Sequence, residues 1–89
     1  MTAQERQSAL SRGVAALNAW LVEHHADARV ELIERGLIGR AFHYALRVYA
    51  LEGEYAGQEV IHELGPFSQA LGSLEAIHVV WATVAAIEG

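Results

Sequence analysis

Apolar residues near the start of the chain recur every three or four positions, which is the spacing of one face of an α-helix. The stripe consists of Leu10, Val14, Leu17 and Leu21. Polar residues, Asn18 among them, take the other side, and Thr2 with Glu5 forms the capping box that typically begins a helix. The pattern predicts a helix from about Ala3 to His24.

The middle of the chain changes to alternation, the period of a β-strand. One parity from position 41 onward holds Phe42, Tyr44, Leu46, Val48 and Ala50. The segment EGEYAG (52–57) follows, and its two glycines predict a hairpin loop. In the strand after it, Val60 and Leu64 face the core side. This pairing predicts that Arg47 lies beside Glu63 on the outer face of the sheet.

A further strand is predicted before this hairpin, near residues 29–34. Val30 and Leu32 alternate there with charged residues. Gly36 and Gly39 would each weaken a helix by about 1 kcal/mol, so we expect a turn through these glycines.

The last predicted element is a helix. Pro66 has no backbone N–H for a sheet and ends the preceding strand. The helix is expected to begin at Ser68 or Ser73, because serine is a favourable N-cap. Its apolar face consists of Leu74, Ile77, Val80, Trp81 and Val84. The opposite face carries Val79 and is only weakly polar, which predicts contact with more than one element or with a second chain.

These elements predict one domain, residues 1–89, of the α+β class: an N-terminal helix, a three-stranded antiparallel meander and a C-terminal helix. The alternative is an all-α helical bundle, in which residues 29–64 are helical. The outer face of the predicted sheet is unusually apolar for a surface in water, so we expect the first helix or another subunit to cover it. The interface candidates are Tyr49, Leu51, Ile61 and Val79.

Composition adds an expectation of self-association. Of the 89 residues, 53% are apolar, more than so small a domain can bury alone. The net charge of −5, with six arginines and no lysine, argues against nucleic-acid binding. No cysteine is present to form a disulfide or a thiolate metal site. We expect a cytoplasmic protein without a membrane segment, because Glu75 and His78 interrupt the most apolar stretch.

Two Glu-x-x-His pairs are the sharpest chemical signal. They are Glu59 with His62 and Glu75 with His78. On helices, paired copies of this motif bind two metal ions in four-helix bundles. In a strand, however, Glu59 and His62 would point to opposite faces and could not share an ion. The main expectation is therefore no metal and no cofactor, with a metal–carboxylate site at these four residues as the alternative.

Other catalytic patterns do not stand out. The serines lack a recognisable nucleophile elbow or base partner. The segment RGLIGR (35–40) lacks the spacing of a phosphate-binding loop. No catalytic residue is predicted, and an enzyme is the less favoured class.

The second half of the chain resembles a group of small bacterial domains of unknown function. Residues 41–88 follow their pattern of a strand pair, a loop and a helix opening Gly-x-Asp-Ser-x-Gln-Ala-Leu. The positions that match this opening are Ser73, Leu74, Ala76 and Ile77. Gly72 stands in place of the aspartate and Glu75 in place of the glutamine. The resemblance implies the hairpin, and it gives no activity that could be carried over to this chain.

The expected function is a small, acidic, non-enzymatic protein-interaction module. Its charge and size are similar to those of immunity and antitoxin proteins, which bind basic partners. The partner is expected to be another protein or a second copy of the chain. A small-molecule pocket between the sheet and the last helix is a further alternative.

Overall fold

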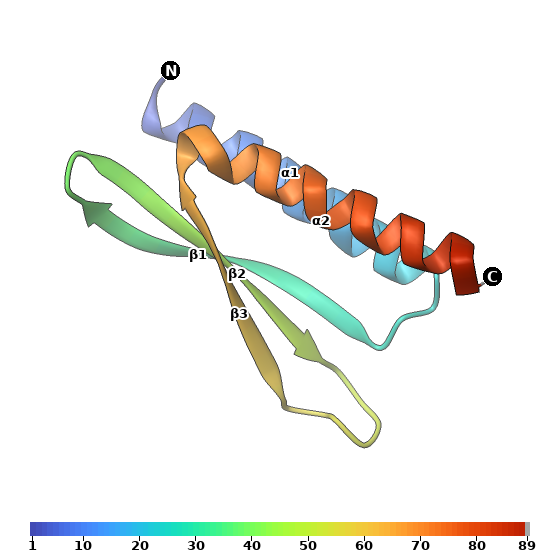
Figure 1. Cartoon of the computed structure of the whole chain (residues 1–89). Helices are drawn as coiled ribbons and strands as arrows, with labels where there is room; N and C mark the ends of the chain where they lie inside the picture. The colour runs from blue at the N-terminus through green and yellow to red at the C-terminus, as the bar shows by residue number, and fades with distance from the viewer. Residues whose placement is uncertain (89) are drawn as a thin grey trace.

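The computed structural model describes residues 1–88 and has two layers. In chain order the elements are α1 (Ala3–Glu23), β1 (Ala28–Ile38), β2 (Ala41–Ala50), β3 (Glu59–Pro66) and α2 (Phe67–Glu88). The strands form an antiparallel sheet in the order β1-β2-β3, and the two helices lie side by side on one face of it (Figure 1). The predicted α+β meander is confirmed.

Helix α1 forms for the reasons that its sequence indicates. The Glu5 N–H donates to Thr2 Oγ1 at 3.1 Å, and the Thr2 N–H donates to Glu5 Oε1 at 3.3 Å, so the capping box is present. The four buried residues of α1 are Leu10, Val14, Leu17 and Leu21, as predicted. The helix ends at Glu23, and His25 follows with a φ of 54° that turns the chain toward the sheet.

Strand β1 is longer than predicted. The sequence pattern placed a strand at 29–34 and a turn through both glycines, but the strand continues to Ile38. Gly36 lies at a register shift after Glu34 and has a φ of 84°, a conformation that glycine adopts without a steric penalty. A β-bulge therefore absorbs the extra residue, and only Gly39 belongs to the turn.

Helix α2 follows β3 without a loop. The strand ends at Pro66, as predicted, and the helix begins at the next residue, Phe67. The expected start at Ser68 or Ser73 is wrong, because Gly65 with a φ of 78° already turns the chain out of the sheet. The first turn of α2 is thus fixed directly to the end of β3.

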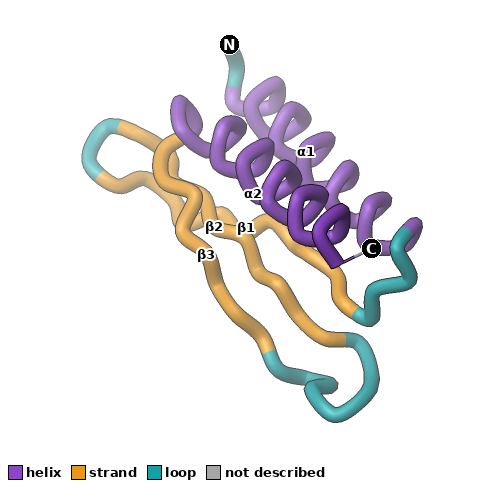
Figure 2. Tube along the Cα trace, turned by 45° about the vertical axis from the view of Figure 1, so that its right-hand side comes forward, coloured by secondary structure: helices purple, strands orange, loops and turns teal. Residues whose placement is uncertain are grey.

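Both helices pack on the same face of the sheet. Of the two covers expected for the outer face, the first helix is therefore wrong, and no other element of residues 1–88 covers that face (Figure 2). Cover by another subunit stays a prediction. The helices approach closely at Gly13, where a Cβ atom would lie 2.9 Å from Leu74 Cδ1. The core between the layers consists of Leu10, Val14, Leu17, Leu21, Val30, Tyr44, Leu46, Leu64, Ala70 and Leu74.

Candidate interaction surface on α2 and β3

The helices cover the sheet unevenly. Val30, Val48 and Val60 are partners in one row across the three strands, on the helix-facing side. Val30 is 3% exposed, Val48 is half-buried against the core, and Val60 is 57% exposed. The helices therefore cover β1 most completely and β3 least, and the first half of β3 is exposed to solvent.

One flank of α2 is open on the same side of the molecule. His78 packs edge-on against Trp20 of α1, with ring centroids 6.5 Å apart, so this part of α2 faces α1. Val80 lies two residues further, about 200° around the helix axis, and is 58% exposed. Val84 lies one turn after Val80 and is also exposed. Both valines are therefore on the side of α2 away from α1.

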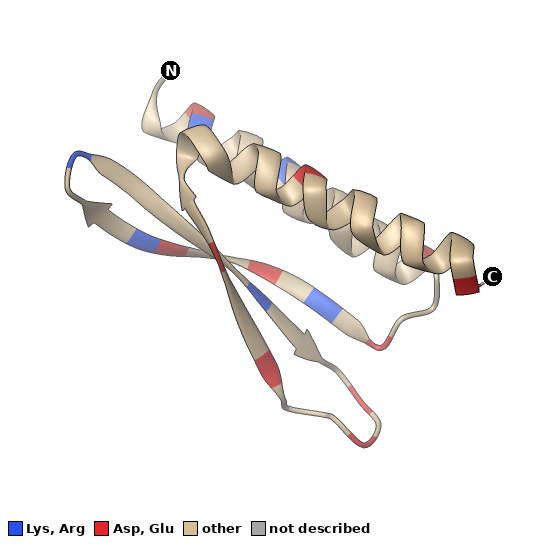
Figure 3. Ribbon diagram, in the orientation of Figure 1, with Lys and Arg blue, Asp and Glu red and all other residues tan. Residues whose placement is uncertain are grey.

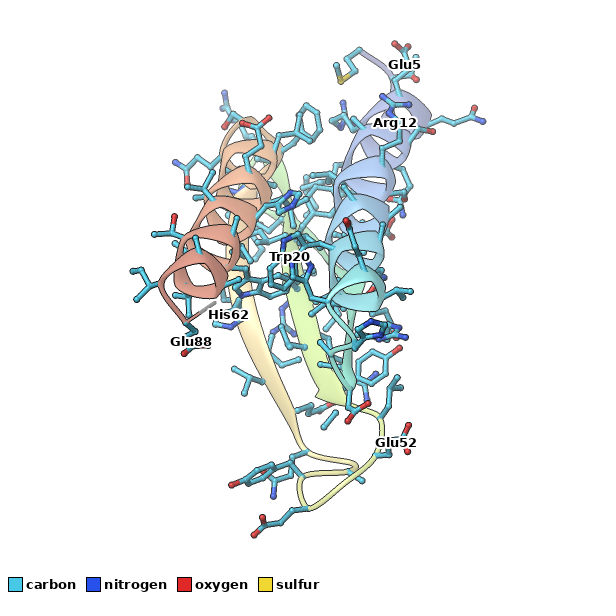
Figure 4. All side chains as sticks on the ribbon, turned by 90° about the vertical axis from the view of Figure 1, so that its right-hand side faces the viewer. Glu5, Arg12, Trp20, Glu52, His62 and Glu88 are labelled. Carbon is cyan, nitrogen blue, oxygen red and sulfur yellow. The ribbon has the colours of Figure 1, made fainter. Side chains whose placement is uncertain are left out.

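This flank stands on the β3 side of the molecule. Viewed along the helices, α2 lies over β3 and α1 over β1, with Trp20 between the helices and His62 below α2 (Figure 4). Val60, Val80 and Val84, with half-buried Ile77 beside them, are called here the α2–β3 surface. It is an apolar surface that no other part of residues 1–88 covers.

The total exposed area matches this lack of cover. The chain exposes 5896 Å², whereas a folded monomer of 9.7 kDa exposes about 5,100 Å². The excess is roughly 800 Å², which is the area that one partner contributes to a standard protein–protein interface. The chain therefore exposes more surface than an average monomer of its mass.

Helix α2 carries little charge. Its acidic residues are Glu75 and Glu88, it has no basic residue, and charged residues gather instead on the strands, the loops and α1 (Figure 3). By length and composition α2 could cross a membrane, and 11% of its most apolar window is buried. Helix α2 therefore presents a largely apolar and weakly charged surface.

The outer face of the sheet carries ion pairs instead. Arg47 on β2 contacts Glu31 of β1 at 3.4 Å and Glu59 of β3, and its guanidinium lies 4.4 Å from the centre of the Tyr49 ring. The predicted pairing of Arg47 with Glu63 is wrong. The register places Ile61 opposite Arg47, and Glu63 lies two pairs further along the strand, opposite Ala45.

Glu63 finds a partner from the other edge strand. Arg35 of β1 reaches across β2 to Glu63 of β3 at 2.6 Å. Hydrogen bonding to Glu63 and the charge of that carboxylate raise the pKa of Arg35, and the hydrogen bond to Glu59 does the same for the pKa of Arg47. Arginine thus links the two edge strands at two levels of the sheet.

The predicted interface candidates do not form one surface. Tyr49 is half-buried beneath Arg47, and Ile61 is its neighbour on the same outer face. Leu51 is exposed at the end of β2, whereas Val79 is exposed on α2, in the opposite layer. Alternation in β3 places Ile61 next to Val60 on the strand but on the other face of the sheet.

The four residues of the metal hypothesis are also separated. Glu59 is held by Arg47 on the outer face, while His62 lies on the inner face. Glu75 and His78 line a cleft of about 320 Å³ between the two helices. In the part of the chain that the structure describes, no three His, Asp or Glu side chains form a group that could hold a metal ion.

Asn18 is the residue whose role the sequence reasoning missed. Its side-chain amide donates to the Val30 carbonyl at 3.0 Å and accepts from the Val30 N–H at 2.8 Å. A signal was present, because Asn18 follows Val14 by four residues and precedes Leu21 by three, the spacing of the buried stripe. Asn18 therefore joins α1 to β1.

Comparison of the chain with protein-family models, with curated proteins and with solved structures found no match to any of them.

Proposed function

We propose that the protein is a non-enzymatic interaction module of the cytoplasm that self-associates through the α2–β3 surface. The observation that carries this proposal is the coincidence of two uncovered apolar parts, the flank of α2 at Val80 and Val84 and the first half of β3 at Val60. Both parts lie on one side of the molecule and carry no charge. Burial of apolar area is the main driving force for such an association.

The exposed area favours a second copy of the chain as the partner that binds the α2–β3 surface. The exposed area exceeds that of a typical monomer by roughly the 800 Å² that each subunit buries in a standard interface. A closed dimer needs one surface that complements itself, and an apolar surface without charges meets this requirement without like-charge repulsion. The net charge of −5 then remains outside the interface, where it is available to a basic protein partner.

Sedimentation of three purified proteins tests the proposal: the natural chain, Val80→Asp and Val22→Asp. Val22 is the matched control, because it is also an exposed helical valine, 54% exposed, but lies on α1. We expect the natural chain and Val22→Asp to be dimers, and Val80→Asp to dissociate at least about tenfold more readily, because dimerisation would bury its charge. A natural chain that stays monomeric, or equal dissociation of both variants, would contradict the proposal.

Flotation with vesicles of neutral and anionic phospholipid separates a protein partner from a membrane. If the natural chain is monomeric and floats with vesicles, and Val80→Asp does not, the α2–β3 surface binds lipid and the proposed self-association is wrong. A dimer that stays with the soluble fraction supports the proposal.

A further inference from the structure

The contact between Asn18 and Val30 reveals which backbone groups face the edges of the sheet. In an antiparallel sheet, both backbone groups of one residue point to the same side, and successive residues alternate between the two sides. Because the N–H and the C=O of Val30 both bind Asn18, they point to the free edge of β1. Val48, the partner of Val30 on β2, therefore directs its own groups toward β3.

The loop after β2 agrees with this assignment. Ala50, two residues after Val48, donates to the Gln58 carbonyl at 3.1 Å and accepts from the Gly57 N–H at 3.3 Å, both on the β3 side. Val60, the partner of Val48, accordingly turns its backbone groups to β2. The residues of β3 whose N–H and C=O face the free edge are Glu59, Ile61 and Glu63.

The two edges of the sheet differ in their protection. On β1, Asn18 occupies the backbone groups of Val30, and the bulge at Gly36 interrupts the regular edge. On β3, no side chain within residues 1–88 hydrogen-bonds to the free backbone groups of residues 59–63. Pairing with Arg47 and Arg35 weakens the repulsion that the glutamates of β3 exert on an incoming strand, although it does not remove it. Within residues 1–88, the β3 edge therefore has fewer obstacles to another strand than the β1 edge.

We propose that the free edge of β3 pairs antiparallel with β3 of a second copy, which joins the two sheets into one of six strands with all four helices on one face. This proposal rests on the proposed self-association and specifies its geometry. In the register derived below, this pairing satisfies the open backbone groups of residues 59 and 61 of both copies.

The position of α2 is compatible with this arrangement. Helix α2 contacts both β3 and β2, so its axis lies about one strand spacing, roughly 4.8 Å, from the two-fold axis. The two α2 helices would then be about 10 Å apart, which is the distance of packed helices. Val80 and Val84 lie on the flank of α2 that is turned away from α1, which is the side of the second copy.

Charge selects the register of the new strand pair. If Ile61 of one copy stood opposite Ile61 of the other, Glu59 would oppose Glu63, which is unfavourable. Placing Val60 opposite Val60 avoids this and buries a side chain that is 57% exposed in the single chain. Val60 then occupies a non-hydrogen-bonded pair, in which the two Cα atoms are about 4.5 Å apart. That distance is compatible with a disulfide between cysteines at this position.

A single-cysteine scan tests the pairing, because the natural chain has no cysteine. The variants Val60→Cys, Ile61→Cys and His62→Cys each report one of the three central registers, and Val22→Cys on α1 reports random collision. Under mild oxidation we expect Val60→Cys to form the disulfide-linked dimer at least about tenfold faster than Val22→Cys. Preferential crosslinking at Ile61→Cys or His62→Cys instead would support edge pairing in a shifted register.

Sedimentation of the same variants under reducing conditions separates this inference from the proposed function. If the chain is a dimer and none of the three β3 variants crosslinks faster than Val22→Cys, the edge pairing is wrong, while self-association through α2 stands. If the chain is monomeric, both are wrong.

Discussion

Asn18 is bound to Val30 by two hydrogen bonds, one in each direction, so a side-chain amide of α1 takes the place that a neighbouring strand would occupy on β1. The amide is part-buried and lies between the helix and the sheet edge. It both attaches α1 to β1 and occupies backbone groups at the free edge of β1 that another strand would need.

Substitution Asn18→Ala removes both bonds and leaves the backbone groups of Val30 without a protein partner. We expect the free energy of unfolding to fall by about 1–3 kcal/mol, and the Val30 amide to exchange with solvent faster. Thermal unfolding and hydrogen exchange measure the two effects. The control is Gln4→Ala, an exposed amide on the same helix; an equal loss in both variants would show that the contact with Val30 does not matter.

The close approach of the helices at Gly13 predicts that Gly13→Ala destabilises the natural chain but stabilises a variant in which Leu74 is shortened. Alanine gains about 0.5–1 kcal/mol over glycine in a helix, but its Cβ atom would lie 2.9 Å from the buried Leu74 side chain. Overpacking costs about 1–3 kcal/mol, so we expect Gly13→Ala to destabilise. Gly72→Ala, which meets no atom within 4 Å, is expected to stabilise.

A double-mutant cycle checks the cause. In a Leu74→Ala background the contact is absent, so Gly13→Ala is expected to stabilise there. If Gly13→Ala destabilises equally in both backgrounds, packing against Leu74 is not the reason.

Leu17 tests the core beneath the helices. It is buried, whereas Val22 on the same helix is exposed. We expect Leu17→Ala to lower the free energy of unfolding by about 2–5 kcal/mol and Val22→Ala to change it by less than about 0.5 kcal/mol. Denaturant titration of both variants measures these changes. Similar losses of stability in the two variants would mean that the face of α1 assigned to the core is wrong.

Arg47 tests the outer face. The substitution Arg47→Leu removes contacts with Glu31, Glu59 and Tyr49, all at the surface, so we expect a smaller loss of thermal stability than for Leu17→Ala. The loss is expected to shrink in 1 M salt, which screens exposed charges. The control is Arg12→Leu, since Arg12 has no ion pair within residues 1–88.

The pH dependence of the Arg47 contribution follows from the direction of its pKa shift. The hydrogen bond to Glu59 raises the pKa of Arg47 in the folded chain, so its contribution is complete below the pKa of the unfolded chain and is lost only as the pH rises through the folded pKa. The effect of Arg47→Leu is therefore expected to be constant between pH 6 and pH 9. If the stability difference between the natural chain and Arg47→Leu disappeared between pH 6 and pH 9, the assigned ion pairs would be contradicted.

Local pattern predicted most of the fold. The stripe from Leu10 to Leu21 and the alternation from Phe42 to Ala50 each have one period that suits one element, so helix α1 and strand β2 follow from them. The bulge at Gly36 was not predictable in this way, because a glycine in a strand signals a turn and a bulge equally.

The candidate surface could be predicted only in part. Hydropathy indicated that the last helix is apolar on more than one side, but it could not show that both helices share one face of the sheet. Alternation correctly assigns Val60 to the helix-facing side, but Val60 is exposed because the helices leave the first half of β3 uncovered, and this depends on packing between segments far apart in the chain. Ile61 and Val79 were chosen for their exposure, and they lie in different layers.

The side-by-side position of α1 and α2 has a consequence for the order of synthesis. Helix α1 is translated before α2 and packs against it, so the stripe of α1 lacks its final cover until α2 (Phe67–Glu88) has been translated. At about 5–20 residues per second, these 22 residues take roughly 1–4 s. During that interval the nascent chain exposes the apolar stripe of α1, and transiently exposed apolar surface of this kind is what chaperones protect during synthesis.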